Sequence, residues 1–349
     1  MVGFIVPDLD GPVSGGTLFN RMLVSSLAAA GEHCKVLSPI AAISALAEGA
    51  ASDTFWVDSL FLDHVAGLAR AARGGARLGL LVHYLPSLVT HGDGVARGDL
   101  TPVEARALSS VDALLVPSRF MRSAVARLLD SPRPILELEP GRLAKGLAGA
   151  PDTPIRAVMV ANLLPGKGVL PFLRRLAGDS QTNDQFVLDV VGGDSFDCTY
   201  AGECRRVAGE VRLQGRVRLR GALSPDETIA QMAACNLCVS ASTMESYGMV
   251  LAEARTLGLP ILANPGGNVQ TLVEAQAGGG VLPDAAELAR AFLGLCRDPV
   301  EHGRRLHRAR ACPLPARPWA MVAAEFLRQT DLLSAVRRPS QSYTDVHRA

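Results

Sequence analysis

The chain alternates twice over between short apolar runs and helical stretches, and this pattern restricts the folds that it can adopt. Strand-like runs separated by amphipathic helices predict parallel sheets with helices packed on them. Six such runs occur in each half of the chain, at 2–6, 34–38, 54–58, 78–82, 112–116 and 134–138, and at 155–161, 186–191, 216–221, 235–240, 259–263 and 279–283. The predicted fold class is α/β, with two Rossmann-like, doubly wound parallel-sheet domains in tandem.

The two halves are joined by residues 139–154, which are rich in Gly, Pro and Ala and show no sustained periodicity. Such a segment is typical of a connection between domains. We therefore divide the 349 residues into domains at 1–150 and 151–318, each of ordinary size. An amphipathic helix is expected at 319–336, followed by a polar tail at 337–349.

Composition excludes several classes of partner. Lys and Arg number 35 against 34 Asp and Glu, so a partner bound through charge neutralisation, such as nucleic acid, is not expected. No apolar run approaches the ~20 residues that span a bilayer, and the first residues read as a buried strand, not a signal peptide. The seven cysteines are too scattered for a disulfide framework, and Cys235-Asn-Leu-Cys238 is interpreted as structural. We expect a cytoplasmic protein without a transmembrane segment.

In open parallel sheets, ligands bind at the carboxyl ends of the strands, so the loops there are the first candidates for a site. The loop after the first run ends in Gly15-Gly16, where the following helix offers free N–H groups to an anion. A plain strand-to-helix connection is an equally good interpretation. Asp8 and Asp10 have the spacing of a DxD metal motif, but a match this short is expected by chance, and we predict no metal.

Two further loops carry one candidate side chain each. His83 ends the fourth run, where it could donate to a sugar hydroxyl or share a proton, although a core histidine is as good an interpretation. Lys167 lies on a glycine-flanked loop after the first strand of the second domain, and its ammonium suits a diphosphate. The loop is not a Walker A motif, and an exposed loop lysine is the alternative.

The most specific motif is Met244-Glu245-Ser-Tyr-Gly-Met-Val-Leu-Ala-Glu253-Ala, in which a strand leads through a glycine loop into a helix expected to begin near Met249. Loop N–H groups there can bind phosphate, while the two carboxylates accept hydrogen bonds from hydroxyls. A solvated helix start is the alternative. The predicted substrate-binding residues of this motif are Ser246, Tyr247, Gly248, Met249, Val250 and Glu253.

These residues together resemble the retaining glycosyltransferases of the GT-B fold, specifically glycosyltransferase family 4. The E-x7-E signature of that family corresponds to Glu245 and Glu253, and its K-G loop corresponds to Lys167-Gly168. The resemblance extends over about residues 1–335. Its other matches are Gly15-Gly16, His83, Pro117-Ser118, Gly258-Leu-Pro260, Gly266-Gly267-Asn268 and the C-terminal helix, which in the family crosses back to the first domain.

The resemblance implies a hexosyltransferase that uses a nucleotide diphosphate sugar, with a UDP-sugar expected, and retains the anomeric configuration. The acceptor would bind the first domain, and the donor the second, across a cleft between them. Lys167 would neutralise the leaving diphosphate, Glu245 would bind sugar hydroxyls and Glu253 the ribose, with His83 beside the reacting sugar. The base is assigned to the loops at Gly192 and Gly221-Ala-Leu223. No cofactor is implied.

One position departs from the family pattern. Asn162 stands where most members have an arginine that shares the diphosphate with the lysine, and we count it among the substrate-binding residues. Its presence keeps open a catalytically weak or silent sugar-nucleotide-binding protein. A nucleotide-sugar epimerase of GT-B fold is a second alternative.

The acceptor is predicted from charge. Residues 1–150 hold 13 Lys and Arg against 14 Asp and Glu, so attraction to an anionic membrane is not indicated. A soluble small molecule or a glycan is the predicted acceptor, with the loops at 84–99 and 59–64 as candidates for its binding.

Overall fold

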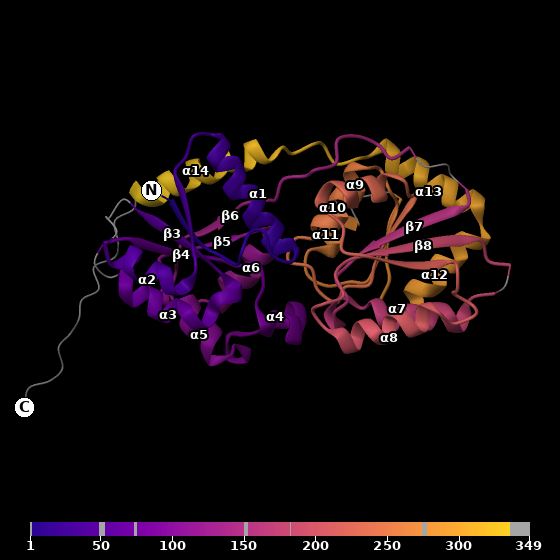
Figure 1. Ribbon diagram of the computed structural model, residues 1–349, viewed down its shortest axis with the longest axis horizontal. Coiled ribbons are helices and arrows are strands. Elements are labelled where there is room, and N and C mark those ends of the chain that lie inside the picture. The colour runs from indigo at the N-terminus through magenta and orange to yellow at the C-terminus, as the bar shows by residue number, and fades with distance from the viewer. Residues whose placement is uncertain are drawn as a thin grey trace, which may run out of the picture.

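A computed structural model describes residues 2–48, 53–72, 75–149, 153–181, 183–273 and 278–335. The chain forms two lobes side by side along the long axis of the molecule, each with a parallel sheet between layers of helices (Figure 1). The division between the two sheets falls between Glu137 and Ile155. The α/β class and the two tandem sheets predicted from the sequence are confirmed, while the domain limits at 150 and 151 stay a prediction.

The first sheet has the order β2-β1-β3-β4-β5-β6, with all neighbours parallel. Helices α2, α3, α5 and α6 pack on one face, and α1 packs on the other. The elements of this lobe are β1 (Val2–Ile5), α1 (Gly15–Ala29), β2 (Cys34–Leu37), α2 (Pro39–Glu48), β3 (Thr54–Asp58), α3 (Leu62–Ala71), β4 (Arg77–Leu81), α4 (Pro86–His91), α5 (Pro102–Ser110), β5 (Ala113–Val116), α6 (Arg119–Leu128) and β6 (Ile135–Glu137).

The second sheet has the order β12-β11-β10-β7-β8-β9, again parallel throughout. Helices α7, α8 and α12 cover one face, and α9, α10 and α11 cover the other. The elements are β7 (Ile155–Val160), α7 (Val169–Asp179), β8 (Phe186–Val191), α8 (Cys198–Ala208), β9 (Val217–Gly221), α9 (Pro225–Ala233), β10 (Leu237–Ser240), α10 (Met249–Thr256), β11 (Ile261–Ala263), α11 (Val269–Val273), β12 (Gly280–Val281), α12 (Ala285–Arg297) and α13 (Pro299–Ala311).

Helix α14 (Trp319–Ala335) returns to the first lobe and lies beside α1 (Figure 1). Its Phe326 is fully buried, with its ring centroid 5.8 Å from that of Phe4 and 5.9 Å from that of Trp56. This confirms the predicted crossing helix, which the structure describes as far as Ala335. The tail predicted at 337–349 lies outside the described residues.

The connection between the sheets is held by charged and polar side chains. Arg142 donates to Glu139 Oε1 at 2.8 Å and to the hydroxyl of Tyr247 at 3.0 Å, and its backbone N–H donates to the carbonyl of Arg317 at 2.8 Å. The outgoing segment near 142 and the returning segment near 317 are therefore tied together. We refer to residues 138–149 as the crossover.

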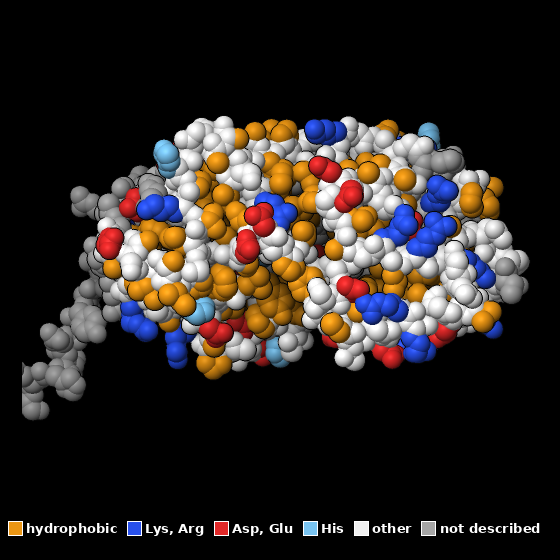
Figure 2. All heavy atoms as spheres, viewed as in Figure 1, with side chains coloured by type: hydrophobic (Ala, Val, Ile, Leu, Met, Phe, Trp, Pro, Cys, Tyr) orange, Lys and Arg blue, Asp and Glu red, His pale blue; other side chains and the backbone are white. Residues whose placement is uncertain are grey.

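The surface agrees with the near-neutral composition. Figure 2 shows basic and acidic side chains interspersed over both lobes on the face in view. Within the described part of the chain, no helix combines the length and the apolar character needed to cross a membrane.

Candidate functional site

Loops from both lobes meet at the carboxyl ends of the strands. Ser246, which follows β10, donates through Oγ to the carbonyl of His83, which follows β4, at 2.6 Å. Ser118, which follows β5, donates through Oγ to the carbonyl of Ser246 at 2.5 Å. The side chain of Met244 packs into the core of the first lobe. The predicted His83 and E-x7-E loops thus lie in direct contact.

Lys167 and Glu245 form an ion pair, with Nζ 2.8 Å from Oε1. The lysine side chain is 36% exposed and that of the glutamate 20%, so both remain within reach of solvent and of a ligand. Gly168 permits this position because its φ is +65° and a Cβ there would lie 2.0 Å from the carbonyl oxygen of Ala241. The structure therefore brings all three predicted catalytic residues, His83, Lys167 and Glu245, to one place.

The imidazole of His83 contacts polar side chains of α1 and β3. Its Nε2 lies 2.9 Å from Asn20 Oδ1, and Asn20 Nδ2 donates to Asp58 Oδ2 at 2.5 Å. Burial lowers the pKa of His83, and the negative charge of Asp58, 3.8 Å away, only partly opposes this. The imidazole is 11% exposed, and its Nε2 pairs with a side chain of α1 instead of with backbone. Its role in binding stays a prediction.

Helix α1 begins at Gly15, two residues before the amphipathic pattern that starts at Thr17. Ser14 caps the helix and so determines this earlier start. The N–H of Thr17 donates to Ser14 Oγ, and the N–H of Ser14 donates to Thr17 Oγ1, which is a reciprocal capping box. Gly15 and Gly16 are therefore the first helical residues. A Cβ on Gly15 would lie 4.0 Å from Met249 Sδ, so the start of α1 lies against the start of α10.

The second glutamate of the motif is bound to the crossover. Glu253 is 6% exposed and accepts hydrogen bonds from the N–H of Leu143 at 2.7 Å and of Ala144 at 2.9 Å. Burial raises the pKa of this carboxyl, although the two amide hydrogen bonds oppose the rise. Tyr247 also points to the crossover, where its hydroxyl donates to Glu139 Oε1 at 2.7 Å. Gly248, which follows Tyr247, is the N-cap of α10 and has a φ of +88°. The next two residues, Met249 and Val250, are partly buried.

Asn162 bridges the two lobes. Its Nδ2 donates to the carbonyl of Val13 at 2.9 Å, and its Oδ1 accepts from the N–H of Gly193 at 2.8 Å. The neighbouring Gly192 touches the same loop, because a Cβ there would lie 2.1 Å from the carbonyl oxygen of Ala161. The position that carries a cation in the resembled family is therefore occupied here by an amide that joins the loop before α1 to the second lobe.

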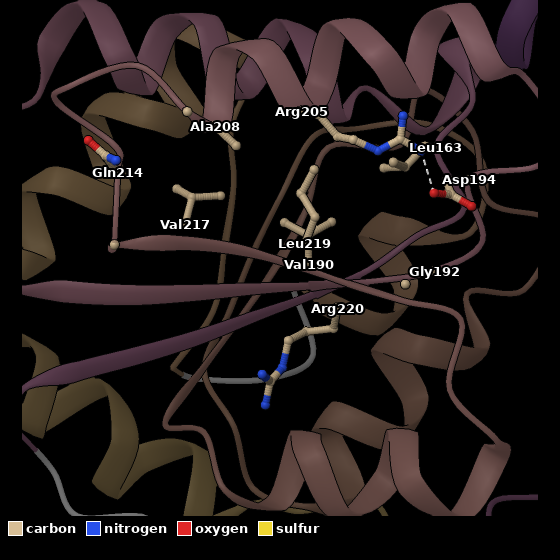
Figure 3. Close-up of a pocket in the computed structure, with 13 residues that line it drawn as sticks. Leu163, Val190, Gly192, Asp194, Arg205, Ala208, Gln214, Val217, Leu219 and Arg220 are labelled. Carbon is tan, nitrogen blue, oxygen red and sulfur yellow. Dashed lines mark hydrogen bonds and ion pairs between the residues drawn. The ribbon is translucent and has the colours of Figure 1, made fainter.

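The predicted base-binding loops border two cavities. Gly192 and Gly221 line a cavity of 540 Å³ between α8 and β9, where Arg205 extends toward Asp194 (Figure 3). These two side chains are paired at 2.5 Å. Leu223 lines a second cavity, of 570 Å³, which shares Leu219 and Arg220 with the first. Both predicted loops thus lie beside open space.

The cysteine pair belongs to the apolar core of the second lobe. Cys235 and Cys238 are buried there, and burial raises the pKa of each thiol to about 12. Among the residues that the structure describes, no group of three or more His, Cys, Asp or Glu side chains could hold a metal ion. The absence of a metal requirement stays a prediction.

Sequence reasoning missed Asn20, Asp58, Glu139 and Arg142. Asp58 was detectable in principle, because a carboxylate that ends a fully buried strand needs a partner. Glu139 and Arg142 lie in the segment interpreted only as a connection. Asn20 gave no signal, because a single polar residue within a helix is ordinary.

Two parallel Rossmann-like sheets with facing loop edges and a returning C-terminal helix define the GT-B fold, the architecture of a class of nucleotide-sugar-dependent glycosyltransferases. Comparison with known proteins agrees with this class. Residues 154–298 match the family described as Glycosyl transferases group 1. This match lies within the second lobe and, with the structural similarities below, supports a GT-B glycosyltransferase.

Two curated relatives are similar over part of the chain. Alpha-monoglucosyldiacylglycerol synthase of Streptococcus pneumoniae is 22% identical over an alignment of 201 residues that covers 53% of this chain and 45% of that protein. D-inositol 3-phosphate glycosyltransferase of Streptomyces bingchenggensis is 27% identical over 198 residues, 56% of this chain and 37% of that protein. The chain thus spans less than half the length of these relatives.

Solved structures match nearly the whole chain. Sucrose-phosphate synthase from Thermosynechococcus elongatus has a TM-score of 0.74 at 20% identity, over 96% of this chain and 99% of that one. Anabaena Alr3699/HepE, solved in complex with UDP and glucose, has a TM-score of 0.73 at 17% identity, over 96% and 100%. These likenesses establish the fold.

Proposed function

We propose that the protein is a retaining glycosyltransferase that transfers a hexose from a nucleotide diphosphate sugar, with a UDP-sugar as donor. The observation that carries the proposal is the convergence of His83, Lys167 and Glu245 from three separate loops, linked through Ser246. The match of residues 154–298 to a glycosyltransferase family supports a nucleotide-sugar donor, as does the likeness to HepE, which was solved with UDP and glucose bound.

The ion pair gives Lys167 and Glu245 their roles. Such a partly exposed pair contributes only about 0–1 kcal/mol, so a ligand can replace it at little cost. The donor diphosphate would bind the ammonium of Lys167 in place of Glu245, and a sugar hydroxyl would donate a hydrogen bond to the carboxylate of Glu245. The two side chains are thus held near their working positions before the donor arrives.

The rest of the donor is assigned to neighbouring loops. The ribose would be bound by Glu253, which is buried against the crossover and must first be uncovered, and the base by the loops at Gly192 and Leu223. Asn162 stands in place of a second cation and carries no charge. The N–H groups at Gly16 and Gly248 would therefore bind the diphosphate oxygens that Lys167 does not contact. Tyr247, Met249 and Val250 would take part through the backbone of this loop.

Retention is proposed to follow a front-face route. The bond from the anomeric carbon to the leaving phosphate oxygen breaks as the acceptor oxygen attacks from the same face. The leaving phosphate takes the proton of the acceptor hydroxyl, so no protein nucleophile is required. We propose a soluble small molecule or a glycan as acceptor, bound mainly by the first lobe.

The proposal is tested with a panel of UDP-hexoses and a cell extract as the source of acceptor, with products identified by mass spectrometry and their anomers by NMR. Lys167→Ala and Glu245→Ala should each lower turnover by about 10²–10³-fold. Lys35→Ala, which removes an exposed lysine on β2, is the matched control and should keep full turnover. Unchanged rates in both site variants would reject the site assignment.

A catalytically silent sugar-nucleotide-binding protein is the second candidate, and Asn162 is the observation that favours it. The amide supplies no charge to a diphosphate and is already bonded on both sides. Saturable UDP-sugar binding without hydrolysis or transfer to any acceptor would support this candidate. An epimerase would show itself by interconversion of the donor sugars.

A further inference from the structure

A chain of buried polar contacts runs behind His83. Asn20 and Asp58 are both fully buried, and Asn20 lies between the carboxylate of Asp58 and the imidazole of His83. The second carboxylate oxygen of Asp58 accepts the N–H of Leu60 at 2.8 Å. Both polar ends of the Asn20 amide are therefore occupied, and neither of them reaches the space that a ligand would fill.

The carboxylate determines which way the amide faces. Only the NH₂ group of Asn20 can donate to Asp58 Oδ2 at 2.5 Å, because the reversed amide would bring two oxygen atoms together. The carbonyl oxygen of Asn20 must then face His83 Nε2, at 2.9 Å. An oxygen acceptor requires a hydrogen on that nitrogen. In a neutral imidazole this leaves Nδ1 without a hydrogen, as an acceptor.

Nδ1 is the nitrogen that remains available. It makes no hydrogen bond within the described residues, and it is not one of the fully enclosed polar atoms that lack a partner. The ring itself is fixed by Phe19, whose centroid lies 5.0 Å away at an interplanar angle of 65°, and by close contact with Gly16. The imidazole therefore has one orientation and one free acceptor.

We infer that Asn20 is a positioning residue that fixes His83 as the Nε2–H tautomer, so that Nδ1 accepts a hydrogen bond from a hydroxyl group of the bound sugar. The sugar part of this inference rests on the proposed function, and the tautomer part does not. His83 thereby selects a hydroxyl donor at one position of the sugar and cannot itself donate a proton there.

Burial lowers the pKa of the imidazole, and the amide of Asn20 lies between Nε2 and the carboxylate of Asp58. A carboxylate bonded directly to Nε2 would favour the imidazolium, in which both nitrogens carry hydrogen and neither accepts. Here the carboxylate of Asp58 of β3 is the charge that acts on His83 from within the described part of the chain. His83 also contacts neutral groups, namely Gly16, Phe19 and Asn20 of α1, Ser59 after β3 and Ser246 after β10.

The tautomer is measured directly by ¹⁵N NMR of histidine-labelled protein. His83→Gln identifies the His83 signals among those of the seven histidines, and the exposed His64 serves as reference. In the wild type at pH 7 we expect a protonated Nε2 and a bare Nδ1. A protonated Nδ1, or an imidazolium, would overturn the inference whether or not the protein transfers sugar.

Asp58→Asn tests the chain of contacts, because it keeps the shape and removes the charge that orients Asn20. We expect the His83 signals to shift toward a mixture of the two tautomers. A signal unchanged from the wild type would show that Asn20 does not owe its orientation to Asp58 and would overturn the inference. Should this variant not fold, the wild-type measurement alone decides.

The sugar contact is tested with UDP-hexoses that each lack one hydroxyl. In the wild type, kcat/KM for one of them should fall by about 2–10-fold, the effect of one neutral hydrogen bond. In Asp58→Asn this preference should shrink to less than about twofold. A preference that is equal in both proteins would overturn the role of Nδ1, whereas no turnover with any donor would instead reject the proposed function.

Discussion

Gly16 lies at the start of α1, where a side chain would press on the imidazole of His83. A Cβ there would be 3.2 Å from His83 Cδ2 and 3.3 Å from its Cβ, which is tighter than ordinary contact. Gly16→Ala should therefore displace the ring from Asn20. We expect kcat/KM for the donor to fall about five- to tenfold, which corresponds to one lost hydrogen bond of about 1–1.5 kcal/mol.

The matched control for Gly16→Ala is Gly202→Ala, in the interior of α8, where nothing lies within 4 Å of the added methyl group. It should stabilise the protein by about 0.5–1 kcal/mol, because alanine is the better helix former, and should keep kcat/KM unchanged. Steady-state kinetics and thermal unfolding of both variants provide the comparison. A Gly16→Ala enzyme with normal kcat/KM would contradict the prediction.

Single residues of the site were predictable where a local signal marks them. Lys167 and Glu245 stand in short glycine-containing loops after strands, and His83 ends an apolar run, so position along the chain was informative. Asn20 was not predictable, because its partner Asp58 is 38 residues away and meets it only through the order of the sheet. The partners of Glu253 are backbone amides, which carry no sequence signal at all.

At the scale of elements, the apolar pattern predicted α14, and its packing leads to a stability prediction. Phe326 is fully buried between Phe4 and Trp56, so Phe326→Ala should remove about 3–5 kcal/mol from the free energy of unfolding of the first lobe. Met321→Ala, on the same helix but 52% exposed, should cost less than about 0.5 kcal/mol. Urea denaturation followed by tryptophan fluorescence measures both, and equal effects would contradict this packing.

The boundaries of elements depend on side-chain hydrogen bonds that periodicity does not reveal. The apolar run at 235–240 forms a strand only from Leu237 onward. The preceding residue, Asn236, accepts the N–H of Arg156 with its side-chain Oδ1 at 2.8 Å, so this N–H is not available to the backbone of β10. Helix α1 similarly begins at Gly15 because of the capping box formed by Ser14 and Thr17. The existence and order of the strands followed from apolar runs, whereas their ends followed from single polar side chains.

At the scale of the whole molecule, the crossover that connects the two lobes is held in part by a titratable side chain, that of Glu139. Burial would raise the pKa of Glu139, but hydrogen bonds from Tyr247 and Arg142 outweigh it and hold the pKa below its usual value. A lowered carboxyl pKa contributes stability above the unfolded value of about 4.3, and this stability is lost as the pH falls through the folded value.

Glu139→Gln should therefore be less stable than the wild type at pH 7, and the difference should shrink as the pH falls below about 4. Denaturation midpoints measured for both proteins from about pH 7 to about pH 3.5 provide the test. A difference that stays constant over this range would show that the charge of Glu139 is not what ties the crossover to Tyr247 and Arg142.

Glu253 links the crossover to the site, because it holds the N–H groups of Leu143 and Ala144 with the same carboxylate that is proposed to bind the ribose. The two amides leave the carboxylate with further lone pairs, but Glu253 is only 6% exposed, so ribose hydroxyls can reach it only if the crossover residues that cover it move. Donor binding should therefore loosen the part of the crossover around Leu143 and Ala144.

Hydrogen exchange of the two amides, resolved by NMR, measures this directly. Saturating UDP should speed exchange at Leu143 and Ala144, while Ala148, whose N–H donates to the carbonyl of Leu257 at 2.8 Å, should keep its rate as an internal control. In Glu253→Ala both amides should exchange fast with or without UDP. If UDP binds to the wild type and leaves the two amides as protected as before, Glu253 belongs to the crossover alone, and the ribose is recognised by other groups.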